Sequence, residues 1–191
     1  ENFQEEISFI NGDWWVQDFS SFLPLYNFKK INKNKLLLDA CAAPGGKSFQ
    51  ILSKKLNVIL NDKSKNRIQT LKSNLKRLKL SAKILNEDFI RFDNKRKYDV
   101  IIIDAPCSAV GTIRRNPEIF FKNKGPNFDK LLSLQENMLE KASFLLNTNG
   151  FIIYMTCSFL QIETIDQVKK FLNLNNNFVL SSFKLRENQK N

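Results

Sequence analysis

The sequence predicts an α/β protein whose strands form a mostly parallel, doubly wound sheet. Two observations lead to this fold class. From about residue 35 onward, short apolar runs alternate with segments whose apolar residues recur at helical spacing. The run between Asp99 and Asp104 is apolar without interruption, which is typical of a strand covered on both faces of its sheet.

Each element is placed by this alternation. Ser64 is expected to cap a helix, because Ile68, Leu71 and Leu75 follow it on one helical face. Strands are expected at residues 35–39, 57–62, 82–85, 99–104, 151–155 and, as the last strand, 178–183. Helices are expected at residues 47–55, from 64 onward, at 131–146 and around 165–172. Residues 1–34 stand outside the alternation and form an aromatic lead-in that is expected to pack on the sheet.

The composition is basic. The chain has 191 residues, enough for one domain with a sizeable core. Its net charge is +11 and its isoelectric point about 9.6, so a polyanion is the expected partner, with RNA or DNA ahead of a membrane. A lysine-rich solvated surface would give the same composition. No apolar run approaches the ~20 residues of a membrane helix, and the N-terminus lacks a signal-peptide pattern.

The cysteine and histidine counts narrow the chemistry. Three cysteines without a secretory signal indicate reduced thiols in a reducing compartment, and we expect the cytoplasm. The absence of histidine is more decisive, because it excludes Ser-His-Asp and Cys-His catalysis and any zinc site that uses histidine. Three thiols without a CxxC pattern lead us to expect no metal.

Two of the cysteines, Cys107 and Cys157, follow apolar strands and lie beside serines. Loops after strand ends bind ligands in an α/β sheet, so these thiols are expected to converge on one substrate. Two alternatives compete with this interpretation. A buried cysteine is usually a small core residue, an interpretation that we keep for Cys41. A disulfide between Cys107 and Cys157 is not expected as a stable feature in a reducing compartment.

The loop at residues 41–48 joins the first strand to the first helix and allows three interpretations. A phosphate-binding P-loop fits its glycine-lysine-serine ending, but Cys41 replaces the first glycine of that pattern and Pro44 stiffens the loop. A dinucleotide site lacks its G-x-G-x-x-G pattern. S-adenosylmethionine fits best, because Asp62 and Asp88 follow the next two strands, where they can bind ribose hydroxyls and an adenine amine. For Asp62 alone, a helix N-terminal carboxylate is the simpler interpretation.

These motifs resemble those of the Sun/RsmB-type RNA cytosine-C5 methyltransferases, and most closely the bacterial 16S ribosomal RNA branch. Residues 39–48 look like the family's cofactor loop, residues 104–119 are similar to its Pro-Cys motif, and residues 156–158 match its Thr-Cys-Ser motif. Residues 12–21 look like the short motif upstream of the fold. The chain has Ile162-Glu163-Thr164 where the family usually carries Glu-Glu-Asn.

The resemblance implies a Rossmann-like class I S-adenosylmethionine-dependent methyltransferase fold. Residues 1–34 would be a lead-in segment that packs on the catalytic domain, and residues 35–191 would be that domain without its final strand hairpin. The implied activity is methyl transfer from S-adenosylmethionine to carbon 5 of cytosine in RNA, with ribosomal RNA ahead of transfer RNA. The implied cofactor contacts are Cys41, Ala42, Ala43, Pro44, Gly45, Gly46, Lys47, Asp62, Asp88 and Asp104.

The resemblance also assigns roles to the thiols. Cys157 is the implied nucleophile, which adds to carbon 6 and so activates carbon 5, and Cys107 is implied in product release. Asp104 is expected to hold the base at N3 and its exocyclic amine. Because only a few per cent of a free cysteine is thiolate at neutral pH, nearby cations should help, and the candidates are Lys47, Arg114 and Arg115. The candidates for binding RNA phosphates are Arg114, Arg115, Lys122 and Lys124.

Two alternative functions remain open. One is an RNA- and cofactor-binding domain with little or no activity, suggested by the short C-terminus and by Thr164. The other is a P-loop nucleotidase, which Cys41 argues against. We expect RNA as the partner of a monomeric protein, with no metal and no membrane.

Overall fold

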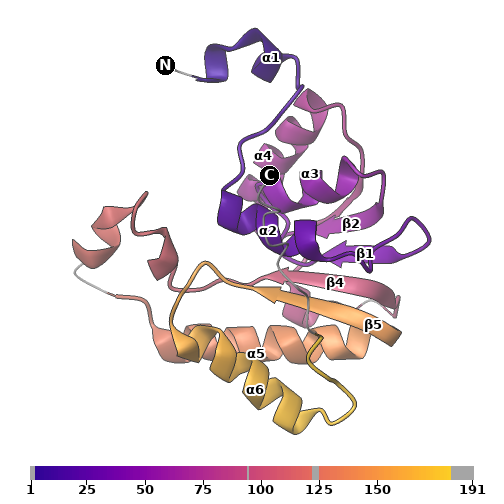
Figure 1. The fold of residues 1–191 in the computed structure, drawn as a ribbon, viewed down its shortest axis with the longest axis vertical. Helices are drawn as coiled ribbons and strands as arrows, with labels where there is room; N and C mark the ends of the chain where they lie inside the picture. Colours follow the sequence, from indigo (N-terminus) through magenta and orange to yellow (C-terminus); the bar gives the residue numbers. More distant parts are fainter. Residues whose placement is uncertain (1–2, 94, 122–124, 182–191) are drawn as a thin grey trace, which may run out of the picture. The chain divides into compact units, whose positions relative to one another are not determined.

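A computed structural model of the chain describes residues 3–93, 95–121 and 125–181. These residues form two compact units. The first contains the described residues up to Asp88 together with Ser181, and the second is Phe89–Leu180. Each unit has parallel strands with helices packed against them (Figure 1), so the predicted α/β class is confirmed in both.

The first unit is built on three strands and the helices that follow them. Its bounds are β1 Leu36–Asp39, α3 Gly46–Leu52, β2 Asn57–Asn61, α4 Lys65–Arg77 and β3 Lys83–Leu85. The strands are parallel and lie in the order β3-β2-β1, with Leu38 opposite Ile59 and Leu60 opposite Ile84. Leu38 and Leu60 are fully buried, which explains why these strands are read from continuous apolar runs.

Helix α4 begins where its sequence predicts. The Ser64 hydroxyl accepts the backbone N–H of Arg67 at 3.4 Å, which satisfies one of the free donors of the first turn. Ile68, Leu71 and Leu75 are buried on one face. Arg67 of the helix pairs with Asp62, and Asn74 donates to the Pro44 carbonyl in the predicted cofactor loop.

The aromatic lead-in packs on the helices of the first unit. It contains η1 (Phe3–Glu5), α1 (Ile7–Ile10) and α2 (Phe19–Asn27). Arg77 of α4 donates to the carbonyls of Phe9 and Trp14, at 2.6 and 3.0 Å, and lies over the Phe9 ring. Trp15 contacts the Phe49 ring of α3 edge to face. Both tryptophans are therefore half-buried packing residues.

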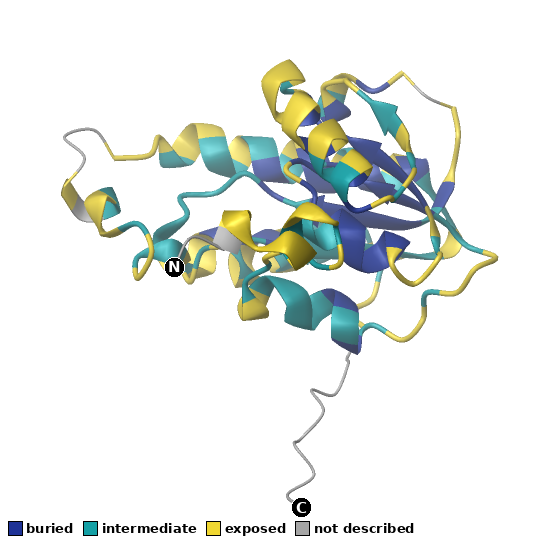
Figure 2. Cartoon of the chain, turned by 90° about the horizontal axis from the view of Figure 1, so that it is seen from above, coloured by how far each residue is buried: buried dark blue, intermediate teal, exposed yellow. Residues whose placement is uncertain are grey.

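The second unit contains the long central strand and its neighbour. The bounds of its strands and longer helices are β4 Tyr98–Asp104, α5 Phe128–Leu145, β5 Leu146–Met155 and α6 Ile165–Leu174. Its short helices are η2 Phe89–Arg91, η3 Val110–Thr112, η4 Pro117–Phe121 and η5 Gln161–Glu163. β4 and β5 are parallel, and α5 packs on both of them and on α6. Figure 2 shows that buried residues gather along the strands, while the outer helical faces are exposed.

Two sequence-based boundaries are wrong. β5 begins at Leu146 rather than at residue 151, because Leu146 already pairs with Tyr98 and a register irregularity separates this pair from the pairing of Val100 with Phe151. The expected last strand is absent from its described part, residues 178–181. There, Phe178 donates its N–H to Asn175 and packs edge to face on the Phe171 ring of α6, so the chain turns against the helix instead of extending.

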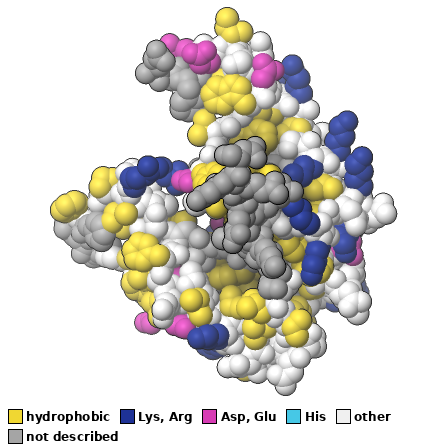
Figure 3. Space-filling view, viewed as in Figure 1, with side chains coloured by type: hydrophobic (Ala, Val, Ile, Leu, Met, Phe, Trp, Pro, Cys, Tyr) yellow, Lys and Arg dark blue, Asp and Glu magenta, His cyan; other side chains and the backbone are white. Residues whose placement is uncertain are grey.

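The surface agrees with the scattered charge of the sequence. On the face shown in Figure 3, Lys and Arg side chains are spread among uncharged ones and do not gather in one tract. In the part of the chain that the structure describes, no helix is both long and apolar enough to span a bilayer.

Candidate active site

The carboxyl ends of β4 and β5 determine where the two thiols lie. Asp104 is opposite Met155, and Ala105 donates its N–H to the Met155 carbonyl at 2.8 Å. Cys107 and Cys157 follow shortly after this last pair, and their Sγ atoms are 3.1 Å apart. The strands therefore bring the two predicted cysteines together, and both thiols are free.

A glycine allows the two cysteine loops to approach each other. Gly111 donates its backbone N–H to the carbonyl of Cys157 at 2.9 Å. A Cβ atom at position 111 would lie 2.7 Å from that oxygen, closer than real Cβ atoms come. Any larger residue would therefore push the loop of Cys107 away from the loop of Cys157.

A buried carboxylate connects both loops. Glu163 of η5 is fully buried and accepts the backbone N–H of Ser108 at 2.8 Å and its hydroxyl at 2.5 Å. Gln135 of α5 donates to the same carboxylate at 3.2 Å and to the Pro106 carbonyl at 2.9 Å. The Ser108 hydroxyl also lies 3.3 Å from that of Ser158. Because each cysteine is followed by one of these serines, Glu163 holds the two loops in one arrangement.

Hydrogen bonds keep Glu163 charged. Burial alone would raise its pKa, but the bonds from Ser108, Ser158 and Gln135 prevail and lower the pKa below its ordinary value of 4.5. Glu163 is kept where this chain departs from the family's Glu-Glu-Asn. The two residues that differ are Ile162, which is exposed, and Thr164, whose hydroxyl donates to the Leu160 carbonyl.

The two thiols ionise as a pair. The hydrogen bond from the Cys157 thiol lowers the pKa of Cys107 to about 7, against the effect of burial and with help from the backbone N–H groups of Ala109 and Cys157. The same contact, together with burial and the charge of Asp104, raises the pKa of Cys157. The pair therefore loses its first proton near pH 7 and keeps the second to higher pH.

Activation of the thiols by Lys47, Arg114 or Arg115 stays a prediction. The groups that lower the pKa of Cys107 in the structure are a thiol and backbone N–H groups. Lys47 donates to the Ser21 hydroxyl at 3.3 Å, and both arginines lie in the exposed turn after η3. The predicted RNA contacts Lys122 and Lys124 lie outside the described residues.

Asp104 belongs to the same site as the thiols. It ends β4, is half-buried, and its charge acts on Cys157. No cluster of cysteine and carboxylate side chains within the described ranges could hold a metal ion.

In the first unit, the predicted cofactor loop lies at the carboxyl ends of β1, β2 and β3. The buried Asn61 joins these ends, because its amide donates to the carbonyls of Ala40 and Glu87 and its oxygen accepts the Glu87 N–H. The Ser48 hydroxyl donates to the buried Asp39 at 2.6 Å. These bonds fix the position of the loop.

Asp62 supports this loop from inside. It is 2% exposed and accepts the backbone N–H groups of Ala43 and Ser64, at 3.2 and 2.9 Å. Arg67 pairs with it at 3.4 Å and also donates to the Ala43 carbonyl. A carboxylate can accept about four hydrogen bonds, so Asp62 can bind a ligand hydroxyl only in addition to these partners.

The other predicted cofactor residues differ in accessibility. Ala42, Ala43 and Gly45 are buried, Cys41, Gly46 and Lys47 are half-buried, and Pro44 and Asp88 are exposed. Gly45 has φ +122°, and a Cβ there would lie 1.9 Å from the Phe49 ring. At Gly46 the nearest atom would be 3.8 Å away, so packing requires only the first of these two glycines.

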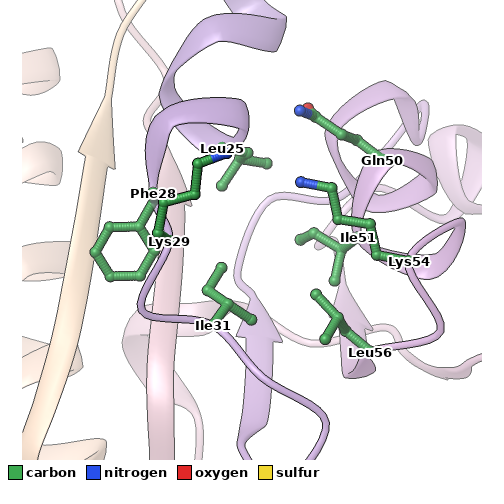
Figure 4. A pocket seen from close by; sticks show the side chains of 8 residues that line it. All are labelled: Leu25, Phe28, Lys29, Ile31, Gln50, Ile51, Lys54 and Leu56. Atoms are coloured by element: carbon green, nitrogen blue, oxygen red, sulfur yellow. The ribbon is translucent and has the colours of Figure 1, made fainter. Parts of the chain in front are cut away.

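A cavity of about 110 Å³ lies elsewhere in the first unit, as Figure 4 shows. Its polar side chains are Lys29, Lys54 and Gln50, and its apolar walls come from α2, α3 and the segments that follow them. Burial and the charge of Lys29 lower the pKa of Lys54. None of its lining residues belongs to the predicted cofactor loop, so this cavity is not part of that loop's site.

Sequence reasoning did not identify several supporting residues, namely Asp39, Asn61, Ser108, Gln135 and Glu163. Three of them had a visible signal, because they stand in the motifs that resemble the family. Asp39 begins the cofactor-loop motif, and Ser108 and Glu163 lie next to and shortly after the cysteines. Gln135 had none, because a polar residue on a helix is normally exposed.

Comparisons with known proteins agree with this geometry. The family model described as 16S rRNA methyltransferase RsmB/F matches residues 27–191. Ribosomal RNA small subunit methyltransferase B of Shewanella oneidensis is 39% identical over 144 residues, which are 73% of this chain and 34% of that protein. The protein of the same name from Vibrio vulnificus is 36% identical over 162 residues, 82% of this chain and 38% of the relative. The chain thus spans about a third of the length of these relatives.

A solved structure shows the fold. NSun6 from Pyrococcus horikoshii, determined with the S-adenosylmethionine analogue SFG, has a TM-score of 0.83 and 26% identity. The match covers 91% of this chain and 46% of that one. The predicted Rossmann-like fold of S-adenosylmethionine-dependent methyltransferases is therefore confirmed.

The first prediction concerns the glycine between the loops. Gly111→Ala should separate the two thiols. The pKa of Cys107 should then rise from about 7 toward the ~8.5 of an isolated cysteine. The pH dependence of iodoacetamide alkylation, read for each cysteine by mass spectrometry, measures this. Gly125→Ala is the matched control, because a Cβ there meets nothing within 4 Å. An unchanged midpoint in Gly111→Ala would contradict the assigned role of the glycine.

The second prediction concerns Glu163. Glu163→Gln should lower the free energy of unfolding at pH 7 by about 1–3 kcal/mol, because buried donors lose a charged acceptor. Since its folded pKa is lowered, the contribution of Glu163 is complete above pH 4.5 and is lost as the pH falls through the folded value. The difference from wild type should therefore shrink in acid. Urea unfolding at pH 7 and at a pH below the folded pKa of Glu163 measures this difference, with the exposed Glu140→Gln as control. An equal loss of unfolding free energy under both conditions would be inconsistent with a charged Glu163.

Proposed function

Because the chain belongs to the 16S rRNA methyltransferase RsmB/F family, we propose that it transfers a methyl group from S-adenosylmethionine to carbon 5 of a cytosine in ribosomal RNA. The observation that carries this proposal is the pair of free thiols, 3.1 Å apart, at the ends of neighbouring parallel strands. In a chain without histidine, this pair supplies both a nucleophile and a base.

The cofactor would supply an electrophilic methyl group. The loop of residues 41–47 and the carboxylates after β2 and β3 are the groups we assign to hold it, together with Asp104. Their chemistry fits a nucleoside with an amino-acid tail, because the strand ends offer backbone N–H groups, a buried carboxylate in Asp62 and an exposed one in Asp88. We assign no phosphate site to this loop.

The first chemical step that we propose uses Cys157. Its sulfur forms a bond to carbon 6, and the electron pair of the C5–C6 double bond moves toward carbon 5 and N3. The thiol proton moves to N3. Asp104 can accept a hydrogen bond from this edge of the ring and so stabilise the protonated base. Cys157 is assigned the attack because it is the more exposed thiol. Since the contact with Cys107 raises the pKa of Cys157, its proton has to leave as the sulfur attacks.

The second step uses Cys107. Once carbon 5 carries the methyl group, the Cys107 thiolate removes the hydrogen from carbon 5 as a proton. The electrons of that C–H bond restore the C5–C6 double bond, and the bond to Cys157 breaks with its electron pair on sulfur. The proton on N3 then returns to Cys157, so one proton leaves the site for each methyl group added. The lowered pKa of Cys107 suits a base that works near neutral pH.

RNA would reach this site with the target base turned out of its stack. We assign Arg114 and Arg115 to its phosphates, since both are exposed in the turn that follows the Cys107 loop, and we keep Lys122 and Lys124 as further candidates. The net charge of +11 supports a polyanionic partner. Because bacterial ribosomal RNA is cytoplasmic, we place the protein there, as a monomer without metal.

A second candidate function has its own observation. The chain spans about a third of the length of its curated relatives, so it would serve as an RNA- and cofactor-binding domain if turnover needed the rest of that length. Binding of both ligands without any 5-methylcytosine in the product RNA would favour this function.

Cys157→Ala should lower methyl transfer by at least about a thousandfold, because it removes the nucleophile. The readout is 5-methylcytosine formed from small-subunit ribosomal RNA and labelled S-adenosylmethionine. Ser133→Ala, an exposed change on α5, is the control and should match wild type. Wild-type turnover by Cys157→Ala would rule out the mechanism.

Cys107→Ala should behave differently from Cys157→Ala. It leaves the attack possible but removes the base for release, so a covalent protein–RNA complex should accumulate. Denaturing gel electrophoresis of the mixture, with and without cofactor, measures it. The opposite pattern, an adduct in Cys157→Ala and none in Cys107→Ala, would exchange the two roles.

A further inference from the structure

The thiol pair that serves catalysis is also placed for a reaction with oxidants. The Sγ atoms of Cys107 and Cys157 are 3.1 Å apart, and a disulfide has an S–S bond of about 2.05 Å. The sulfur atoms must therefore move only about 1 Å closer. Two cysteines whose Cα atoms lie more than about 7 Å apart cannot be bridged without backbone movement.

The surrounding contacts keep the two sulfurs near each other. Gly111 bonds to the Cys157 carbonyl, and the hydroxyls of Ser108 and Ser158 lie 3.3 Å apart. Glu163 binds Ser108 from the buried side. These contacts hold both thiols together, so no loop has to close before they can react.

We propose that Cys107 and Cys157 form a reversible modification site, in which a peroxide converts the pair to a disulfide and switches the enzyme off. The disulfide itself does not depend on the proposed function. Its consequence, loss of methyl transfer, rests on that function, because the bond occupies both the nucleophile and the base.

The reaction balances with hydrogen peroxide as the oxidant. The Cys107 thiolate attacks one peroxide oxygen; an S–O bond forms, the O–O bond breaks, and hydroxide leaves. The Cys157 sulfur then attacks Cys107, the S–S bond forms, and the S–O bond breaks with its electrons on oxygen. The Cys157 proton and one solvent proton convert the two hydroxides to water. Two thiols are oxidised and one peroxide is reduced.

The ionisation of the pair favours this sequence. A thiolate is the reactive form toward peroxide, and the Cys107 pKa of about 7 makes it available near neutral pH. The neighbouring thiol would capture the sulfenic acid before further oxidation. Disulfide formation would therefore protect a catalytic cysteine from the irreversible sulfinic and sulfonic acids.

The experiment treats the chain with hydrogen peroxide and then blocks remaining thiols with N-ethylmaleimide under denaturing conditions. Of three cysteines, we expect only Cys41 to be alkylated, with peptide mapping showing a link between Cys107 and Cys157. Dithiothreitol should restore both thiols and methyl transfer. In Cys107→Ser, peroxide should carry Cys157 to oxyacids, and dithiothreitol should not restore its alkylation.

Three results would overturn the proposal. These are three alkylatable thiols after peroxide treatment, a link that includes Cys41, or oxyacids on the wild-type pair in place of a disulfide. The mapping needs neither RNA nor cofactor. A failure of methyl transfer in the untreated protein would therefore count against the proposed function alone, and a missing link against this inference alone.

Discussion

The parallel pairing of β4 with β5 is the constraint on which the rest of the site depends. The pairing ends with Asp104 opposite Met155, and each cysteine follows a few residues later. A shift of one residue would turn every side chain of a strand to the other face of the sheet. It would also remove the backbone bond from Gly111 to Cys157 and separate two sulfur atoms that now lie 3.1 Å apart. Register is thus the link between an ordinary apolar strand and a chemical site.

Within that geometry, electrostatics gives the two sulfurs different properties. The thiol contact makes one sulfur easy to ionise and the other hard, although their sequences look alike. Glu163 adds a fixed negative charge that would disfavour a nearby thiolate, and backbone N–H groups compensate for it. The pKa of Cys107 is therefore lowered to about 7 by a thiol and by backbone N–H groups, in a chain that has no histidine. The same proximity explains both the proposed release step and the proposed sensitivity to peroxide.

Sequence reasoning succeeded where one property dominates. Continuous apolar runs predicted the buried strands, and Ser64 predicted the start of α4. The position of the two cysteines just after strand ends predicted that their thiols meet. It failed where the outcome depends on contacts between distant residues. The expected strand from residue 178 is replaced by a turn that packs Phe178 on Phe171. Glu163 escaped notice because burial of a charge depends on donors from Ser108 and Gln135, and neither contact follows from local pattern.

The central claim is that Cys157 attacks carbon 6 of a cytosine, and that the RNA is released from Cys157 only when carbon 5 loses its proton. Small-subunit ribosomal RNA in which cytidine is replaced by 5-fluorocytidine tests it most directly, because fluorine cannot leave carbon 5 as a cation and release is blocked. After incubation with S-adenosylmethionine, peptide mapping by mass spectrometry should find a methylated fluorocytidine joined to Cys157. A nucleotide joined to Cys107, or methyl transfer with no covalent complex, would contradict the account.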